Sequence, residues 1–139
     1  MATKLANKIK KSEDLNPPLD QIDNLLNLYN NKKFKNCEKL ARKFVSKYPN
    51  YQFGWKMLSK ILRSLGNIEE SLFAIKKSIE LNPQDFESHN NFGVLLKKSN
   101  KLVEAETSFK NAIKLNPKYE KTYNKLGVTL YQLGKLKEA

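Results

Sequence analysis

The sequence predicts an all-α fold built from antiparallel helix pairs that stack into an array. Three observations predict it. Pro49, Pro83 and Pro117 stand 34 residues apart, and similar text precedes them, such as Leu81-Asn82 and Leu115-Asn116. Apolar residues between the prolines recur at helical spacing. A fixed period of this length is typical of repeat proteins, in which each unit buries its apolar face on its neighbour.

Each unit is expected to contain two helices and two turns. The proline ends the second helix of a unit, because the residue before a proline is pushed out of helical geometry. The apolar stripes are Leu72, Ile75 and Ile79, and Ala105, Phe109, Ala112 and Ile113, before a proline, and Trp55, Leu58 and Leu62, Phe92, Leu95 and Leu96, and Leu126, Leu130 and Leu133 after one. Gly66 and Gly134 are predicted to form the turns within their units, where a residue that tolerates positive φ is required.

The prolines divide the chain into a lead-in and four units. Residues 1–17 are expected to be a basic lead-in, flexible or partly helical, and residues 18–139 the array, with units at 18–51, 52–85, 86–119 and 120–139. The first unit is degenerate, since Gln21 and Asn24 stand where an aromatic residue and a leucine are usual. The fourth is truncated, which leaves leucines such as Leu130 and Leu136 partly uncovered. The chain is therefore expected to be a fragment of a longer protein, or to self-associate through this uncapped repeat.

Small residues mark the places where the two helices of a unit are expected to cross closely. They are Ser59, Gly93 and Gly127 on first helices, and Cys37, Ser71 and Ala105 on second helices. Small side chains let helix axes approach to roughly 8–10 Å. Cys37 is therefore interpreted as a packed residue. His89, which occupies the position of Trp55 and Tyr123, is interpreted in the same way.

The composition excludes most enzyme chemistries. One cysteine and one histidine rule out disulfide frameworks and paired-ligand metal sites, so no metal and no cofactor are expected. The glycines Gly127 and Gly134 are spaced too widely for a phosphate loop, and Leu136 follows Lys135 where a hydroxyl is needed. No apolar run approaches the roughly 18 residues of a membrane span. The sequence thus predicts a non-catalytic, cytoplasmic chain that does not bind membranes.

The period and the residues at fixed positions resemble the tetratricopeptide repeat family over most of the chain. The third unit matches best, with Phe92-Gly93, Leu96, Ala105, Phe109, Ala112 and Pro117. The resemblance implies a right-handed superhelix whose first helices line a concave binding face. The text His89-Asn90-Asn91-Phe92-Gly93 is also similar to the arrays that precede the catalytic domain of O-linked N-acetylglucosamine transferases. Similar arrays precede methyltransferase, sulfotransferase and hydroxylase domains in bacterial proteins.

The resemblance also implies which side chains face the groove. The candidate groove residues are Lys56, Met57, Lys60, Arg63, Asn90, Asn91, Lys97, Lys98, Lys121, Asn124 and Lys125. Lys56, Asn91, Lys121 and Lys125 are similar to the clamp with which chaperone-binding members hold a peptide's terminal carboxylate, although Lys60 replaces an asparagine of that clamp. The groove therefore predicts a protein-interaction module for an extended, acidic or carboxylate-bearing peptide.

Two alternatives for the function stay open. One is a substrate-recruiting N-terminal region of a larger enzyme of the glycosyltransferase or methyltransferase type. The other is single-stranded RNA binding, against which the scarcity of groove aromatics for base stacking argues, so nucleic acid is not the expected partner.

The net charge of +12, from 26 basic and 14 acidic residues, has a bland explanation of its own. Lysine accounts for 24 of the basic residues and asparagine for 16 positions, and both have AT-rich codons. Coding bias does not explain why basic residues gather on the expected inner face while Glu69, Glu70, Glu104 and Glu106 lie on outer helices.

Overall fold

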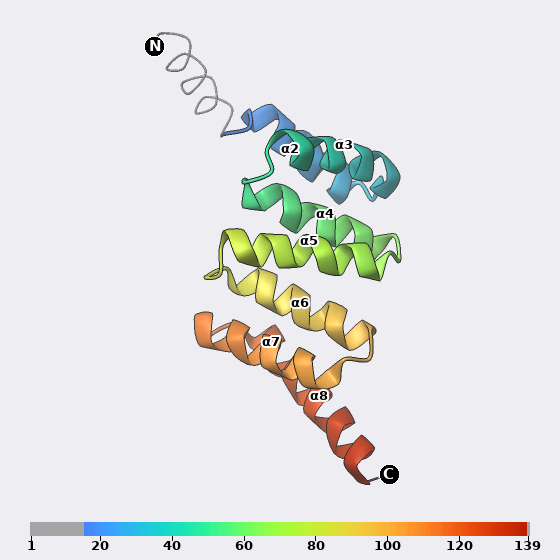
Figure 1. The fold of residues 1–139 in the computed structure, drawn as a ribbon, viewed down its shortest axis with the longest axis vertical. Coiled ribbons are helices and arrows are strands. Elements are labelled where there is room, and N and C mark those ends of the chain that lie inside the picture. Colours follow the sequence, from blue (N-terminus) through green and yellow to red (C-terminus); the bar gives the residue numbers. More distant parts are fainter. Residues whose placement is uncertain (1–15, 139) are drawn as a thin grey trace, which may run out of the picture.

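The fold is that of a computed structural model, which describes residues 16–138 as seven α-helices (Figure 1). In chain order these are α2 (Leu19–Asn30), α3 (Phe34–Lys47), α4 (Gln52–Ser64), α5 (Ile68–Leu81), α6 (Phe86–Lys98), α7 (Leu102–Leu115) and α8 (Glu120–Glu138). No strand occurs within residues 16–138, so the all-α prediction is confirmed. The predicted lead-in lies, apart from Asn16 and Pro17, outside the described residues.

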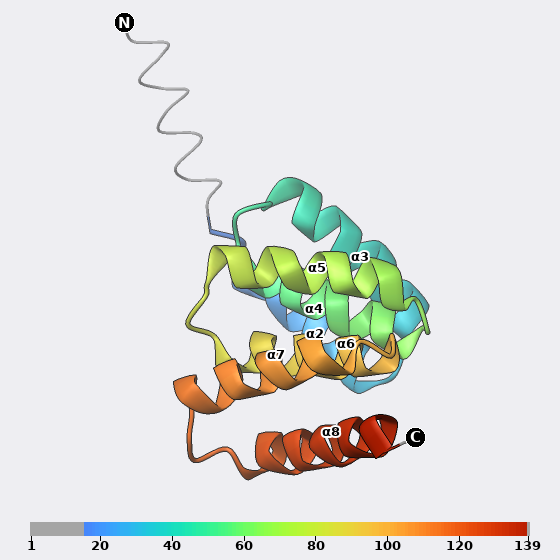
Figure 2. The ribbon, with the colours of Figure 1, turned by 60° about the horizontal axis from the view of Figure 1, so that its bottom comes forward.

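The helices stack as a solenoid that advances from α2 to α8, and the chain reverses direction at each turn (Figures 1 and 2). Each helix packs mainly on its neighbours in sequence, both within a unit, as α4 does on α5, and between units, as α5 does on α6. Helix α6 also touches α8, so first helices of successive units adjoin one another. The predicted array of stacked helix pairs is confirmed.

The turns inside the first three units share one backbone geometry. Lys32, Gly66 and Asn100 stand 34 residues apart, and all three have positive φ, at 58°, 82° and 60°. The residue after each donates its N–H to a carbonyl five residues earlier, as Asn67 does to Leu62 at 2.9 Å. This pattern is the Schellman motif, which favours glycine at the left-handed position. Gly66 forms the turn that the sequence predicts, whereas Lys32 and Asn100 give no such signal.

The predicted turn at Gly134 is wrong, because α8 continues through it to Glu138. In the earlier units the second helix packs on the first, and those contacts favour the turn. No described helix packs on the outer side of α8, so nothing offsets the hydrogen bonds that a turn would break. Leu130 and Leu136 are accordingly 44% and 63% exposed, as expected for an uncovered first helix.

We expect Lys32→Gly to raise the free energy of unfolding by about 0.5–1 kcal/mol. An L side chain in the left-handed region costs roughly 1–2 kcal/mol, and the greater freedom of glycine in the unfolded chain removes roughly 0.5–1 kcal/mol of that gain. Urea unfolding followed by circular dichroism measures the difference. Lys33→Gly is the matched control, because Lys33 has φ −84° and should gain nothing. Equal effects of the two substitutions would contradict this explanation of the turn.

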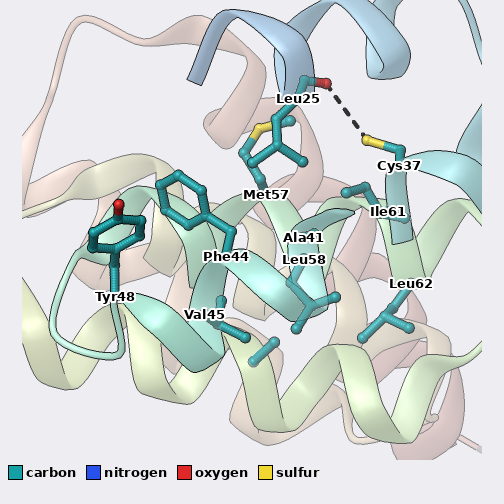
Figure 3. Close-up of a cluster of buried hydrophobic side chains, with 11 residues drawn as sticks. Leu25, Cys37, Ala41, Phe44, Val45, Tyr48, Met57, Leu58, Ile61 and Leu62 are labelled. Atoms are coloured by element: carbon teal, nitrogen blue, oxygen red, sulfur yellow. Dashed lines mark hydrogen bonds between the residues drawn. The ribbon is translucent and has the colours of Figure 1, made fainter. Parts of the chain in front are cut away.

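Two clusters of buried apolar side chains form the interior. The larger joins the first two units and contains Leu25, Cys37, Ala41, Phe44, Val45, Tyr48, Met57, Leu58, Ile61 and Leu62 (Figure 3). In the smaller, Leu96, Ala105 and Phe109 form the buried centre. The thiol of Cys37 is fully buried and donates to the carbonyl oxygen of Leu25 at 3.5 Å. Burial raises the pKa of this thiol, which agrees with its interpretation as a packed residue.

The small residues lie at helix crossings in the second and third units. The hydroxyls of Ser59 and Ser71 lie 3.0 Å apart, and each also donates to the other residue's carbonyl oxygen, at 3.0 and 2.6 Å. A Cβ atom added to Gly93 would lie 2.6 Å from the ring of Phe109. Gly127 differs, since no atom lies within 4 Å of the corresponding point. Its predicted close crossing is not formed in the described residues.

His89 and its counterparts tie the first helix of each unit to the preceding proline. Each side chain reaches the carbonyl oxygen of the proline six residues earlier, through Trp55 Nε1 to Pro49 at 2.7 Å, His89 Nε2 to Pro83 at 2.8 Å and Tyr123 Oη to Pro117 at 2.9 Å. Three different side chains therefore make one repeated contact. This contact gives His89 a structural role at the start of α6.

Candidate functional site

Lys56 on α4, a candidate groove residue, is paired with two carboxylates of the chain itself. Its Nζ lies 3.0 Å from Asp85 Oδ2 and 2.6 Å from Glu87 Oε2. Burial acts to lower the pKa of Lys56, but the hydrogen bonds to Glu87 and Asp85 outweigh burial and raise this pKa above 10.5. The charge of Lys56 is therefore neutralised within the fold, which weakens its predicted role as an anchor for a peptide carboxylate.

Asp85 connects the second and third units through a half-buried polar network. Its Oδ2 accepts hydrogen bonds from Gln52 Nε2 at 2.6 Å and from Ser88 Oγ at 2.7 Å. The hydroxyls of Ser78 and Ser88 lie 2.8 Å apart. Burial acts to raise the pKa of Asp85, but the hydrogen bonds from Ser88, Gln52 and Lys56 outweigh it and hold this pKa below its ordinary 3.8. The network therefore needs the ionised carboxylate.

We expect Asp85→Asn to lower stability at neutral pH by roughly 1.5–3 kcal/mol, because hydrogen bonds to the charged group are lost. The folded-state pKa is depressed, so the stabilisation is present above pH 3.8 and disappears as the pH falls through the folded-state pKa. The variant and the native chain should therefore converge in stability between about pH 5 and about pH 2. Urea unfolding at several pH values measures this. Asp23→Asn, at an exposed position of α2, is the matched control, and a difference that persists at low pH would contradict the account.

Met57 and Asn90, both predicted to face the groove, lie in the interior. Met57 is 4% exposed and belongs to the larger apolar cluster. Asn90 is 5% exposed, and its Oδ1 accepts a hydrogen bond from Thr122 Oγ1 at 3.1 Å. Neighbouring first helices pack closely enough to cover these two positions, so neither offers a surface to a ligand. Asn91 remains half-buried on α6, and Asn124 is exposed on α8.

The other candidate lysines of α4 and α6 keep their charges uncompensated. Lys60 Nζ lies 5.3 Å from the centre of the Tyr29 ring, where a cation–π contact favours the cation. Lys97 is half-buried and Lys98 is exposed at the end of α6. Among the side chains of residues 16–136, no carboxylate lies within 4.0 Å of Lys60, Lys97 or Lys98.

Arg63, Lys121 and Lys125 gather across the groove from α4 and α8, and we call them the cation trio. Lys125 is half-buried, and burial lowers the pKa of its ammonium group. The charges of Arg63 and Lys121 lower this pKa further, so the three cations lie close enough to repel one another. No described carboxylate forms an ion pair with any of them. The trio is therefore a concentrated positive potential, suited to bind an anion.

The second arginine of the chain shows the opposite situation on the outer helices. Arg42 on α3 lies 3.2 Å from Glu38 Oε1 and 2.6 Å from Glu70 Oε2. Lys110 on α7 likewise lies 2.7 Å from Glu106 Oε1. The acidic residues of the second helices thus neutralise their neighbours there, whereas the trio has no such partners.

Sequence reasoning missed several residues of this face. Asp85 and Glu87 neutralise Lys56, and nothing in the repeat pattern pairs them with it. Beside the trio's helix, a hollow of ≈ 330 Å³ is lined by Lys97, Asn100, Leu102, Gln132, Lys135 and Leu136. Lys135 lies outside the groove positions that the family resemblance supplies. The continuation of α8 through Gly134 brings Lys135 into this hollow, and the sequence predicts a turn there instead.

Other site chemistries find no support in the part of the chain that the structure covers. Within it, no three His, Cys, Asp or Glu side chains gather as metal ligands. No helix there is long and apolar enough to cross a membrane.

Comparison with known proteins agrees with the geometry. Three tetratricopeptide repeat family models match residues 55–85, 74–107 and 95–134, which together cover more than half of the chain. No curated protein matches its sequence.

Solved structures share the fold at low sequence identity. The first TPR domain of Spaghetti (RPAP3), bound to the HSP90 peptide SRMEEVD, is 15% identical with a TM-score of 0.80, and the match covers 84% of this chain and 92% of that one. The Yersinia enterocolitica chaperone SycD, in complex with a peptide of the translocator YopD, is 15% identical with a TM-score of 0.76 and coverages of 86% and 93%. A Thermobaculum terrenum O-GlcNAc transferase is 21% identical with a TM-score of 0.72, and the match covers 81% of this chain and 22% of that one. The 34-residue period, the repeated turn geometry and the matched family models lead to one conclusion: this chain belongs to the tetratricopeptide repeat family.

Proposed function

We propose that this chain is a non-catalytic interaction module that binds an extended acidic peptide of a partner protein in the groove formed by α4, α6 and α8. The cation trio is the observation that carries the proposal. Three cations on two helices repel one another without a carboxylate to compensate them, and an acidic ligand would relieve that repulsion.

The groove also offers what an extended peptide needs beside its acidic groups. Lys60 over the Tyr29 ring combines a positive charge with an apolar face. Asn91 and Asn124 supply amide groups that can pair with a peptide backbone. The Spaghetti and SycD domains, which share the fold, are both seen with peptides, and the Spaghetti peptide SRMEEVD contains three acidic residues.

The chain's own ion pairs revise the arrangement that the clamp resemblance implies. Lys56 is occupied by Asp85 and Glu87, so the acidic end of a ligand is proposed to lie at the trio. The compartment is proposed to be the cytoplasm, where the buried thiol of Cys37 stays reduced.

Fluorescence anisotropy with three labelled peptides of equal length tests the proposal. The peptides share leucine and glycine positions and differ in carrying glutamate, glutamine or lysine at the remaining ones. The glutamate peptide should bind at least about tenfold more tightly than the glutamine peptide, and the difference should shrink as added salt screens the charges. Equal binding of the glutamate and glutamine peptides would remove the basic groove as the site. Tighter binding of a single-stranded RNA of equal length, with a steep salt dependence, would favour the nucleic-acid reading instead.

A further inference from the structure

We propose that the cation trio of Arg63, Lys121 and Lys125 is a subsite for a phosphoryl group carried by the bound peptide. This inference rests on the proposed function and specifies the ligand: a phosphorylated side chain at that position of the peptide, in place of a carboxylate. Three features of the trio support it.

The first feature is the number of charges. A carboxylate brings one negative charge and would leave two of the three cations uncompensated. A phosphoryl monoester carries about −1.5 to −2 charges near neutral pH and three acceptor oxygens. Its charge and its number of acceptors therefore match a site of three cationic donors more closely.

The second feature is the placement of arginine in a chain that otherwise uses lysine. Only two of the 26 basic residues are arginine, namely Arg42 and Arg63. Arg42 binds two carboxylates, those of Glu38 and Glu70. Arg63 is the arginine of the trio, and the planar fork of a guanidinium group donates two parallel hydrogen bonds to a phosphoryl group. Lysine, a point charge, lacks this geometry.

The third feature is the contrast with Lys56 on the same helix as Arg63. Lys56 is half-buried, and the fold supplies Asp85 and Glu87 to neutralise it. Lys125 is also half-buried, yet its charged neighbours are Arg63 and Lys121. The half-buried setting reduces solvent screening, which strengthens the attraction for a dianion. The trio is thus arranged as an open anion site, and the surroundings of Lys56 as a closed one.

The test compares three labelled peptides that are identical except at one central position, which carries phosphoserine, glutamate or serine. Anisotropy at fixed ionic strength should show the phosphoserine peptide binding at least about tenfold more tightly than the glutamate peptide. Equal binding of these two peptides would overturn the phosphoryl subsite and leave the proposed acidic-peptide function standing. Binding of none of the three would overturn both.

Substitution of Arg63 separates a phosphoryl subsite from a merely positive surface. Arg63→Lys keeps the charge and removes the fork, so it should weaken the phosphoserine peptide by about tenfold and change the glutamate peptide little. Lys125→Gln should weaken the phosphoserine peptide by a similar factor. Lys114→Gln is the matched control, because Lys114 is exposed on α7 and loses the same charge.

Thermal unfolding establishes that each variant is folded before its binding is measured. Equal losses for both peptides in Arg63→Lys, or an equal loss in Lys114→Gln, would overturn the inference. A single-stranded oligoribonucleotide that binds more tightly than the phosphoserine peptide and depends on Arg63 would overturn it as well, because the phosphoryl group would then belong to RNA.

Discussion

Gly93→Ala is expected to lower the free energy of unfolding by roughly 1–3 kcal/mol, and Gly127→Ala to raise it by about 0.5–1 kcal/mol. The two glycines occupy the same position in consecutive units. A methyl group on Gly93 would lie 2.6 Å from the fully buried ring of Phe109, which has no room to move away. A methyl group on Gly127 would meet no atom within 4 Å, so only the higher helix propensity of alanine remains.

Chemical unfolding of the two single variants and the double variant measures these effects. The two sites do not share a contact, so their effects should add to within about 0.5 kcal/mol. Destabilisation by Gly127→Ala of the size expected for Gly93→Ala would show that a helix covers α8 at that point, either from a second copy or from another segment. Size-exclusion chromatography with light scattering would then identify self-association, and a monomer would exclude it.

Reversal of two charges of the trio, Arg63→Glu with Lys125→Glu, should weaken an acidic peptide by about 100-fold or more. Each charged donor is expected to contribute roughly tenfold to affinity, and the new carboxylates repel the ligand as well. The fold should tolerate the change, because neither residue is paired with a carboxylate among the described side chains. Anisotropy with the glutamate peptide measures the loss.

The control for this reversal is Lys43→Glu with Lys114→Glu. Both residues are exposed on second helices, and the net charge changes by the same amount. This control should weaken the peptide only through the general charge of the chain. An equal loss in both double variants would assign the binding to net charge instead of the trio.

The sequence predicts the fold well because its strongest signals are periodic. The prolines, the apolar stripes and the small residues Ser59, Ser71 and Gly93 each repeat in a way that local physical chemistry explains. The errors occur where tertiary contacts decide the conformation. Gly134 has the residue type of a turn, but the described structure has no second helix to favour one. Lys32 takes positive φ because the repeat geometry imposes it, against the preference of its side chain.

The site is less predictable, because position in a repeat indicates a face of the helix and nothing about the partners on that face. Lys56 stands at a groove position, yet Asp85 and Glu87 of the next unit neutralise it. Met57 and Asn90 lie at the edge of the same face, where the neighbouring unit covers them. The gathering of Arg63 with Lys125, from units two repeats apart, depends on the curvature of the array. That curvature is a property of the packed fold.

Mapping a bound acidic peptide by amide chemical-shift changes tests the central claim most directly. The glutamate peptide, titrated into isotope-labelled protein, should shift the amides of α4, α6 and α8, with the largest saturable changes around Arg63, Asn91 and Lys125. The amides of the outer helices α3, α5 and α7 should change little. Saturable shifts concentrated on those outer helices, or no saturable shifts at all, would contradict the assignment of the groove as the binding site.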